Sequence, residues 1–304
     1  MNYESKNNFN EKKIKTSSSY NKNILTNILT VDVEDYFHVT AFENYVDFND
    51  WGKFDSRIEK NTRRLLELLN RENTKATFFF LGWVAEKYKN LVREVKDQGH
   101  EIGCHSFSHK MIFAQKKEEF KEDTKRAKSI LENLIGERVI GYRAPTYSIT
   151  KDSLWALDIL IEMGFQYDSS IFPIHHDRYG IPNFPRNPHY VEREGVGRIL
   201  EFPLSTVKVL NYNIPIAGGG YFRLFPYKFI QWGIKRINLV ENKFAIIYVH
   251  PWEFDPGQPK IKASYFKKFR HYLNLEKTET KFCKLIKDFR FTSFESVIEN
   301  TVFE

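Results

Sequence analysis

The feature that most constrains the fold is an alternation of short apolar runs with amphipathic segments. The run NILTVDVED at 27–35 precedes leucines at helical spacing, and the run KATFFFLG at 75–82 precedes a second amphipathic segment. Further apolar runs follow at 100–105, 138–145 and 165–168, again separated by residues at helical spacing. This strand–helix unit recurs about four times, which predicts an α/β fold with a parallel sheet or barrel and helices outside.

Residues 171–222 interrupt this alternation. Four prolines between 173 and 188 and the run AGGGYF at 217–222 predict an irregular, loop-rich insertion of the kind that shapes binding grooves. Regular elements are then expected as a helix near 226–240, the strand KFAIIYVH at 243–250, a long polar helix near 262–288 and a short strand near 289–294. The sequence has no visible second domain boundary, so residues 25–304 are expected to form a single domain.

The amino-terminal residues and the bulk composition bear on location and partners. Residues 1–24 are rich in Lys, Asn and Ser and lack the apolar run of a secretory signal, so they are expected to form a disordered basic arm. No stretch approaches the length of a membrane-spanning helix. The net charge is +7, but the basic residues are interspersed with acids, so nucleic acid is not expected as a partner. We expect a cytoplasmic protein whose charge is compatible with peripheral membrane association.

Chemically reactive side chains follow the predicted strands, where the active sites of parallel α/β folds lie. At the end of each run or just beyond it lie Asp32, Glu34 and Asp35 for the first run, His105 and His109 for the third, Arg143, Pro145 and Tyr147 for the fourth, Asp168 for the fifth, and His250 for the late strand. The carboxyl ends of parallel strands meet at one rim, so we expect these side chains to converge.

The run HSFSH at 105–109 places two histidines four residues apart, which on a helical turn would put both imidazoles on one face. Alone this spacing is a weak signal, because it also occurs by chance. A carboxylate from DVED at 32–35 would complete a two-histidine, one-carboxylate site with positions open for water and substrate, as in catalytic metal sites. Such nitrogen and oxygen donors fit zinc, cobalt or nickel.

The remaining strand-end residues suit proton transfer. One acid of DVED can bind the metal while another acts as general base, whereas a role as helix N-cap explains only one of them. Arg143 beside Asp32 would keep that carboxylate ionised and oriented, unless it forms a surface salt bridge. His250 suits a general acid facing the metal, and the plain alternative is a buried structural histidine.

Five of these segments together resemble the motifs of a known family. TVDVED, HSFSH, RAPTY, YDSS and the VH of YVHPWEF are similar to the motifs of polysaccharide deacetylases of the NodB-homology type, carbohydrate esterase family four. GYRAPTYSIT, YDSSIFP, GGGYFRLFP and YVHPWEFDP resemble the branch associated with exopolysaccharide biosynthesis. The resemblance implies a deformed, seven-stranded (β/α) barrel, a C-terminal extension from about 256, and a divalent metal that is usually zinc.

The resemblance also implies an activity and residue roles. The activity is hydrolysis of N-acetyl groups on a polysaccharide or a lipid-linked oligosaccharide. Asp32 would be the general base, Arg143 the residue that orients it, His250 the general acid, and His105 and His109 the metal ligands. The third ligand stays open between Glu34, which strand alternation places on the same face as Asp32, and Asp35, which could reach if the strand ends early.

Substrate contacts are expected near these residues. A backbone N–H near Thr146–Tyr147 would stabilise an oxyanion. The candidates for substrate contact are Pro145, Thr146, Tyr147, Asp168, Tyr221 and Trp252.

Two rival functions remain. Relatives with this fold also hydrolyse ureides or formyl groups. A non-catalytic glycan-binding relative should lack the base or the acid, and this chain keeps Asp32, Arg143 and His250.

Overall fold

The computed structural model describes residues 25–176 and 178–303, so the basic arm expected at 1–24 lies outside the described residues. Its centre is a nine-stranded sheet in the order β10-β1-β2-β3-β4-β5-β7-β6, with β11 also paired to β1. The strands are β1 (Asn27–Val33), β2 (Thr77–Phe80), β3 (Glu101–Cys104), β4 (Gly141–Tyr142), β5 (Tyr167–Asp168), β6 (His189–Arg193), β7 (Gly197–Glu201), β10 (Ile246–Val249) and β11 (Phe291–Thr292). Every neighbouring pair is parallel except β6 with β7. The predicted α/β class with a parallel sheet is confirmed.

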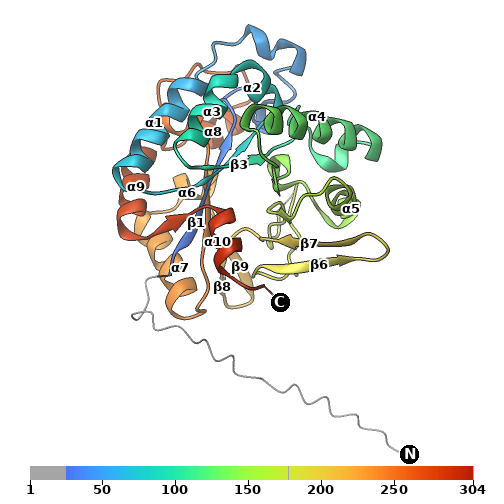
Figure 1. The fold of residues 1–304 in the computed structure, drawn as a ribbon. Coiled ribbons are helices and arrows are strands. Elements are labelled where there is room, and N and C mark those ends of the chain that lie inside the picture. The colour runs from blue at the N-terminus through green and yellow to red at the C-terminus, as the bar shows by residue number, and fades with distance from the viewer. Residues whose placement is uncertain (1–24, 177, 304) are drawn as a thin grey trace, which may run out of the picture.

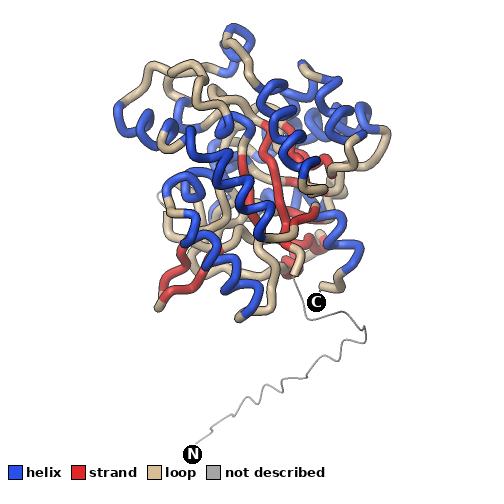
Figure 2. The backbone as a smooth tube through the Cα atoms, turned by 90° about the vertical axis from the view of Figure 1, so that its left-hand side faces the viewer, coloured by secondary structure: helices blue, strands red, loops and turns tan. Residues whose placement is uncertain are grey.

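Helices lie outside the strands, as Figures 1 and 2 show. They are α1 (Ile58–Arg71), α2 (Gly82–Lys87), α3 (Lys89–Asp97), α4 (Lys117–Ile135), α5 (Trp155–Glu162), α6 (Gly219–Leu224), α7 (Tyr227–Leu239), α8 (Tyr265–Tyr272), α9 (Leu275–Asp288) and α10 (Phe294–Asn300). β1 runs through the middle of the molecule and is buried along its whole length, as expected for a central strand covered on both faces. No helix in the described part of the chain is long and apolar enough to cross a membrane.

The structure differs from the sequence expectation in two places. The segment 171–222 is not wholly irregular, because β7 joins the main sheet beside β5, and β8 (Thr206–Val209) pairs with β9 (Tyr212–Pro215). The polar helix expected near 262–288 is divided into α8 and α9, because Asn274 between them adopts a left-handed backbone conformation with φ of 55°.

The amino-terminal end of the sheet holds a buried carboxyl group, Glu101 at the start of β3. Its oxygens accept hydrogen bonds from Thr77 Oγ1 at 2.5 Å, the Tyr167 hydroxyl at 2.7 Å and the backbone N–H of Glu295 at 2.9 Å. Burial outweighs these bonds and raises the pKa of Glu101 from 4.5 to about 7. The protonated form therefore stabilises the fold, and this stabilisation is lost as pH rises from 4.5 through 7.

We expect Glu101→Gln to remove about 3 kcal/mol of pH dependence from the free energy of unfolding across that window. Urea unfolding of both proteins at pH 5 and pH 8 measures this difference. The variant should gain stability relative to the wild type as the pH is raised. Glu299→Gln, on an exposed position of α10, is the control and should leave the pH dependence as it is. Parallel curves for wild type and Glu101→Gln would contradict the prediction.

Candidate active site

The carboxyl ends of the parallel strands bring reactive side chains into one pocket of about 380 Å³. Asp32 lies on β1 and Glu34 follows it, while His105 directly follows β3 and His250 directly follows β10. All four line the pocket, together with His109. The registers of β1 with β2, and of β2 with β3, put these strand ends level with one another. The convergence expected from the sequence is present for these residues.

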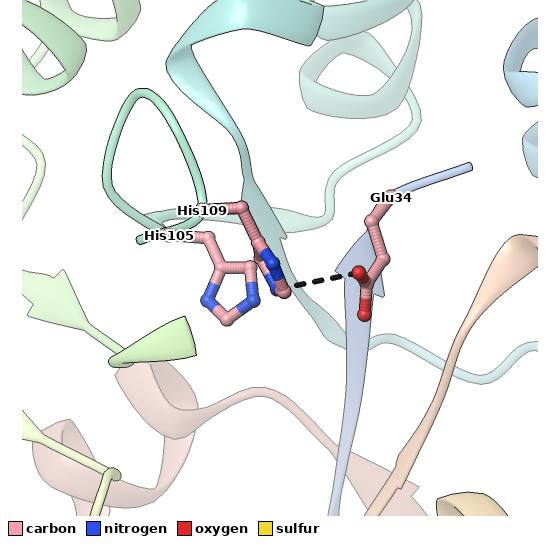
Figure 3. A group of neighbouring side chains, drawn as sticks. All are labelled: Glu34, His105 and His109. Atoms are coloured by element: carbon pink, nitrogen blue, oxygen red, sulfur yellow. Dashed lines mark ion pairs between the residues drawn. The ribbon is translucent and has the colours of Figure 1, made fainter. Parts of the chain in front are cut away.

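Glu34, His105 and His109 form a group suited to a metal ion (Figure 3). One donor atom from each lies within 4.8 Å of the others, and all three residues are buried. Glu34 Oε2 is 3.3 Å from His109 Nε2 and has no hydrogen-bond partner. A buried carboxylate oxygen without a hydrogen bond is costly, and a cation at this point would satisfy it. The donor set therefore fits a divalent ion.

The two histidines are prepared as neutral ligands. Burial lowers the pKa of His105, and it lowers that of His109 to about 4. His105 Nδ1 lies 2.8 Å from the Arg143 carbonyl oxygen, a contact that favours the proton on Nδ1 and leaves the lone pair on Nε2. Metal ligation requires this neutral form of imidazole.

The local conformation of HSFSH differs from the expected helical turn. Ser106 and His109 both have positive φ, of 57° and 54°, so the segment is a strained loop. The Asp123 carboxylate on α4 holds the loop by accepting hydrogen bonds from the backbone N–H groups of Phe107 and Ser108. The histidines meet because of this loop and not because of helical spacing.

Asp35, the other acid considered as a metal ligand, points elsewhere. Its Oδ2 accepts hydrogen bonds from Ser56 Oγ at 2.8 Å, Arg57 N at 2.7 Å and Ile58 N at 3.1 Å. Its Oδ1 accepts one from Tyr36 N at 2.9 Å. The three donors to Oδ2 lie at the start of α1, so the carboxylate caps that helix. The expectation that Asp35 could reach the metal is corrected: Glu34 is the acid beside the histidines.

Replacing Asp35 by Ala should therefore reduce stability and leave the histidine cluster in place. Losing the cap leaves buried backbone N–H groups without partners, and we expect the free energy of unfolding to fall by about 2 kcal/mol. Chemical denaturation measures this change. Asp47→Ala removes an exposed cap from the short helical turn Phe48–Lys53, and its effect should be smaller. An equal loss in both variants would contradict the assignment.

Asp32 is paired with a fully buried arginine. Arg143 Nη1 donates to Asp32 Oδ1 at 2.8 Å and to Thr30 Oγ1 at 2.6 Å, while Nε and Nη2 donate to Ser169 O and Oγ. Burial alone would raise the pKa of Asp32, but the Arg143 charge and the neighbouring histidines hold it below its usual value. The alternative of a surface salt bridge for Arg143 is wrong, since the guanidinium is not exposed.

His250 lies among three acids. Its Nε2 is 3.1 Å from Glu34 Oε1 and 4.0 Å from Asp32 Oδ2, and its Nδ1 is 3.1 Å from Glu253 Oε2. Burial would lower the pKa of His250, but the charges of Glu34 and Glu253 raise it to about 10. His250 therefore carries a proton at neutral pH in this arrangement.

Two buried charges beside His250 were not found from the sequence. Glu253 Oε1 accepts a hydrogen bond from Arg223 Nε at 2.7 Å. Arg223 Nη1 also donates to the carbonyl oxygens of Arg270, His271 and Leu273. The sequence hints at the contact of His250 with Glu253 only through their spacing in HPWE. The pairing of Glu253 with Arg223 could not be predicted, because the two residues lie far apart in the sequence.

The expected substrate-contact residues divide into two groups. Thr146, Tyr147, Tyr221 and Trp252 line the pocket. Pro145 is buried and does not line it. Asp168 is also buried away from the pocket, where it accepts a hydrogen bond from Ser170 Oγ and pairs in register with Glu201 of β7. The expectation that Asp168 touches substrate is corrected: the side chain supports the loop after β5.

Three of the lining residues have roles other than stacking on a sugar ring. The Tyr147 hydroxyl donates to Asp32 Oδ2 at 3.2 Å. The Trp252 ring stacks against His250 and His271, so it serves packing. The backbone N–H of Tyr147 donates to the Ala144 carbonyl oxygen, which leaves that of Thr146 as the candidate oxyanion donor.

Known families and proteins share sequence similarity with parts of this chain. Residues 50–167 match the family model "Polysaccharide deacetylase", and residues 169–299 match "Domain of unknown function (DUF3473)". A peptidoglycan-N-acetylglucosamine deacetylase of Bacillus cereus is 35% identical over 98 residues, which is 32% of this chain and 36% of the relative. A peptidoglycan deacetylase of Helicobacter pylori is 28% identical over 114 residues, which is 38% of this chain and 37% of that relative. The chain thus matches little more than a third of the length of these relatives.

Solved structures show the fold. A protein from Mycobacterium smegmatis assigned as a polysaccharide deacetylase superimposes with a TM-score of 0.58 at 15% identity, over 94% of both chains. The Puue allantoinase superimposes with a TM-score of 0.58 at 14% identity, over 90% of this chain and 88% of that one. These likenesses confirm the predicted fold class of deformed, NodB-type barrels.

Proposed function

We propose that this chain is a metal-dependent hydrolase that removes N-acetyl groups from the amino sugars of a polysaccharide, because residues 50–167 match the family model "Polysaccharide deacetylase". The observation that carries the proposal is the meeting of three parts in one pocket. These parts are the Glu34, His105 and His109 cluster, Asp32 paired with Arg143, and His250 in contact with Glu34 and Glu253. The polymer we propose is an exopolysaccharide or a cell-envelope glycan, which rests on the resemblance to the exopolysaccharide branch.

Glu34, His105 and His109 would hold the divalent ion. Zinc is the first candidate, and cobalt or nickel suit the same donors. Such an ion supplies Lewis acidity, which polarises a carbonyl oxygen and makes water more acidic.

The protein's own groups would move the protons. Asp32 accepts a proton from the attacking water, and Arg143 and the Tyr147 hydroxyl hold its carboxylate in place. The oxygen of water bonds to the acetamide carbon, and the Thr146 N–H stabilises the resulting oxyanion. His250 then donates its proton to the nitrogen as the C–N bond breaks, which releases acetate and a free amine. Glu253 orients His250 through Nδ1.

An acetate-release assay tests the proposal. The zinc-loaded chain should release acetate from N-acetylated oligosaccharides, and a chelator should abolish this release in a way that added zinc restores. Ureides and N-formyl compounds are assayed in the same panel. Their hydrolysis without acetate release from glycans would replace the proposal with another amide hydrolase of this fold. Inactivity on every substrate with zinc bound would favour a binding role.

A further inference from the structure

The segment 256–275 has an unusual charge composition. It contains five basic residues and no acid, whereas the chain as a whole mixes both signs. The basic residues are Lys260, Lys262, Lys267, Lys268 and Arg270. The segment includes α8, so this charge is carried on a defined element of the fold.

One side of α8 exposes large apolar rings. Tyr265 is 74% exposed, Phe266 78% and Phe269 52%, and Arg270 beside them is exposed as well. These four positions have the spacing of a single helical stripe, which we call the α8 face. The Tyr265 ring centroid lies 6.0 Å from that of Phe266 and 6.5 Å from that of Phe269, so the rings form one cluster. The other side of α8 is anchored by His271, which is buried against Trp252.

The α8 face continues into the mouth of the catalytic pocket. Phe269 and Arg270 line that pocket, as does Lys267 from the same helix. Leu224 at the end of α6 lines it too and is half exposed. The apolar and basic surface is therefore contiguous with the opening through which a substrate would enter.

We propose that the α8 face, with the lysines around it, docks on a bilayer that contains anionic phospholipid and holds the pocket mouth at the headgroup layer. Aromatic rings bordered by Lys and Arg are the composition of elements that lie in a membrane interface. The absence of acid from 256–275 makes the charge complementary to an anionic surface and unfavourable for a basic partner. Docking of this kind needs no membrane-spanning helix, and it presents the pocket to a glycan carried on lipid.

Vesicle sedimentation of the full chain tests the proposal without any assay of hydrolysis, so its outcome is separate from that of the proposed activity. The chain should sediment with vesicles of equal parts phosphatidylglycerol and phosphatidylcholine and stay in solution with phosphatidylcholine alone. High salt should weaken the binding, because the lysines contribute through screened charge. Absence of sedimentation with the anionic vesicles would overturn the proposal.

Matched variants locate the binding surface. Lys262→Glu with Lys268→Glu should weaken the vesicle affinity by about tenfold or more. Tyr265→Ser with Phe266→Ser should also weaken it, while the melting temperature stays at the wild-type value. The control is Trp232→Ser with Leu239→Ser on α7, where exposed apolar residues also lie among basic ones. A loss of binding in the control equal to that in the α8 variants would overturn the assignment to α8.

Discussion

Asp32→Asn is expected to lower kcat for acetate release by about 10³-fold, because it removes the proposed general base without changing the size of the side chain. The carboxylate is the group that Arg143 and Tyr147 hold toward the pocket, and its pKa is held low enough for it to accept a proton at neutral pH. Steady-state kinetics with the zinc-loaded variant measure the effect.

The control for Asp32→Asn addresses metal and folding. The variant keeps Glu34, His105 and His109, so its metal content should equal that of the wild type. Asp50→Asn changes an exposed aspartate that pairs with Lys53, and it should leave kcat unaltered. Turnover of Asp32→Asn near the wild-type value, with metal bound, would remove Asp32 from the role of base.

Glu34→Ala should weaken metal binding by at least about 100-fold, since even residues that only orient metal ligands contribute up to that factor. Glu34 offers the single carboxylate in the cluster, and its Oε2 has no other partner. Titration against a competing zinc chelator measures the affinity, and elemental analysis gives the metal content after dialysis.

Asp35→Ala is the matched control, because it removes the adjacent carboxylate from the same segment. It should retain metal while losing stability, as described above. Full zinc occupancy in Glu34→Ala, or loss of zinc from a folded Asp35→Ala, would contradict the ligand assignment.

The sequence predicted those elements whose residue pattern is by itself typical of the structure that they adopt. β1, β2 and β3 were expected because each is a short run with few polar residues that is followed by a segment with helical spacing of its apolar residues. β7 was missed, since the prolines and glycines around it are typical of loops, and its strand depends on pairing with β5 and β6. The break between α8 and α9 was missed because it depends on one left-handed residue, Asn274.

The candidate site was predictable to the extent that its residues follow strands directly. His105 and His250 directly follow β3 and β10, Asp32 is the penultimate residue of β1, and all three line one pocket. Periodicity along a strand could not decide between Glu34 and Asp35 as the metal ligand. The decision depends on where β1 ends and on the backbone N–H groups at the start of α1, which donate to Asp35. Glu253 and Arg223 were missed because their partnership joins segments 30 residues apart.

Residues 50–167 and 169–299, which match two different family models, contribute strands to the same sheet. This affects how the chain can be cut into fragments for expression. The boundary near residue 168 separates β1 to β5 from β7, β10 and β11, although β10 and β11 pair with β1 and β7 pairs with β5. A fragment that ends there would leave the apolar strand β1 with unpaired backbone groups along one side, and open edges of this kind promote aggregation. It would also lack His250. The two regions should therefore be cloned, expressed and exchanged between homologues as a single piece.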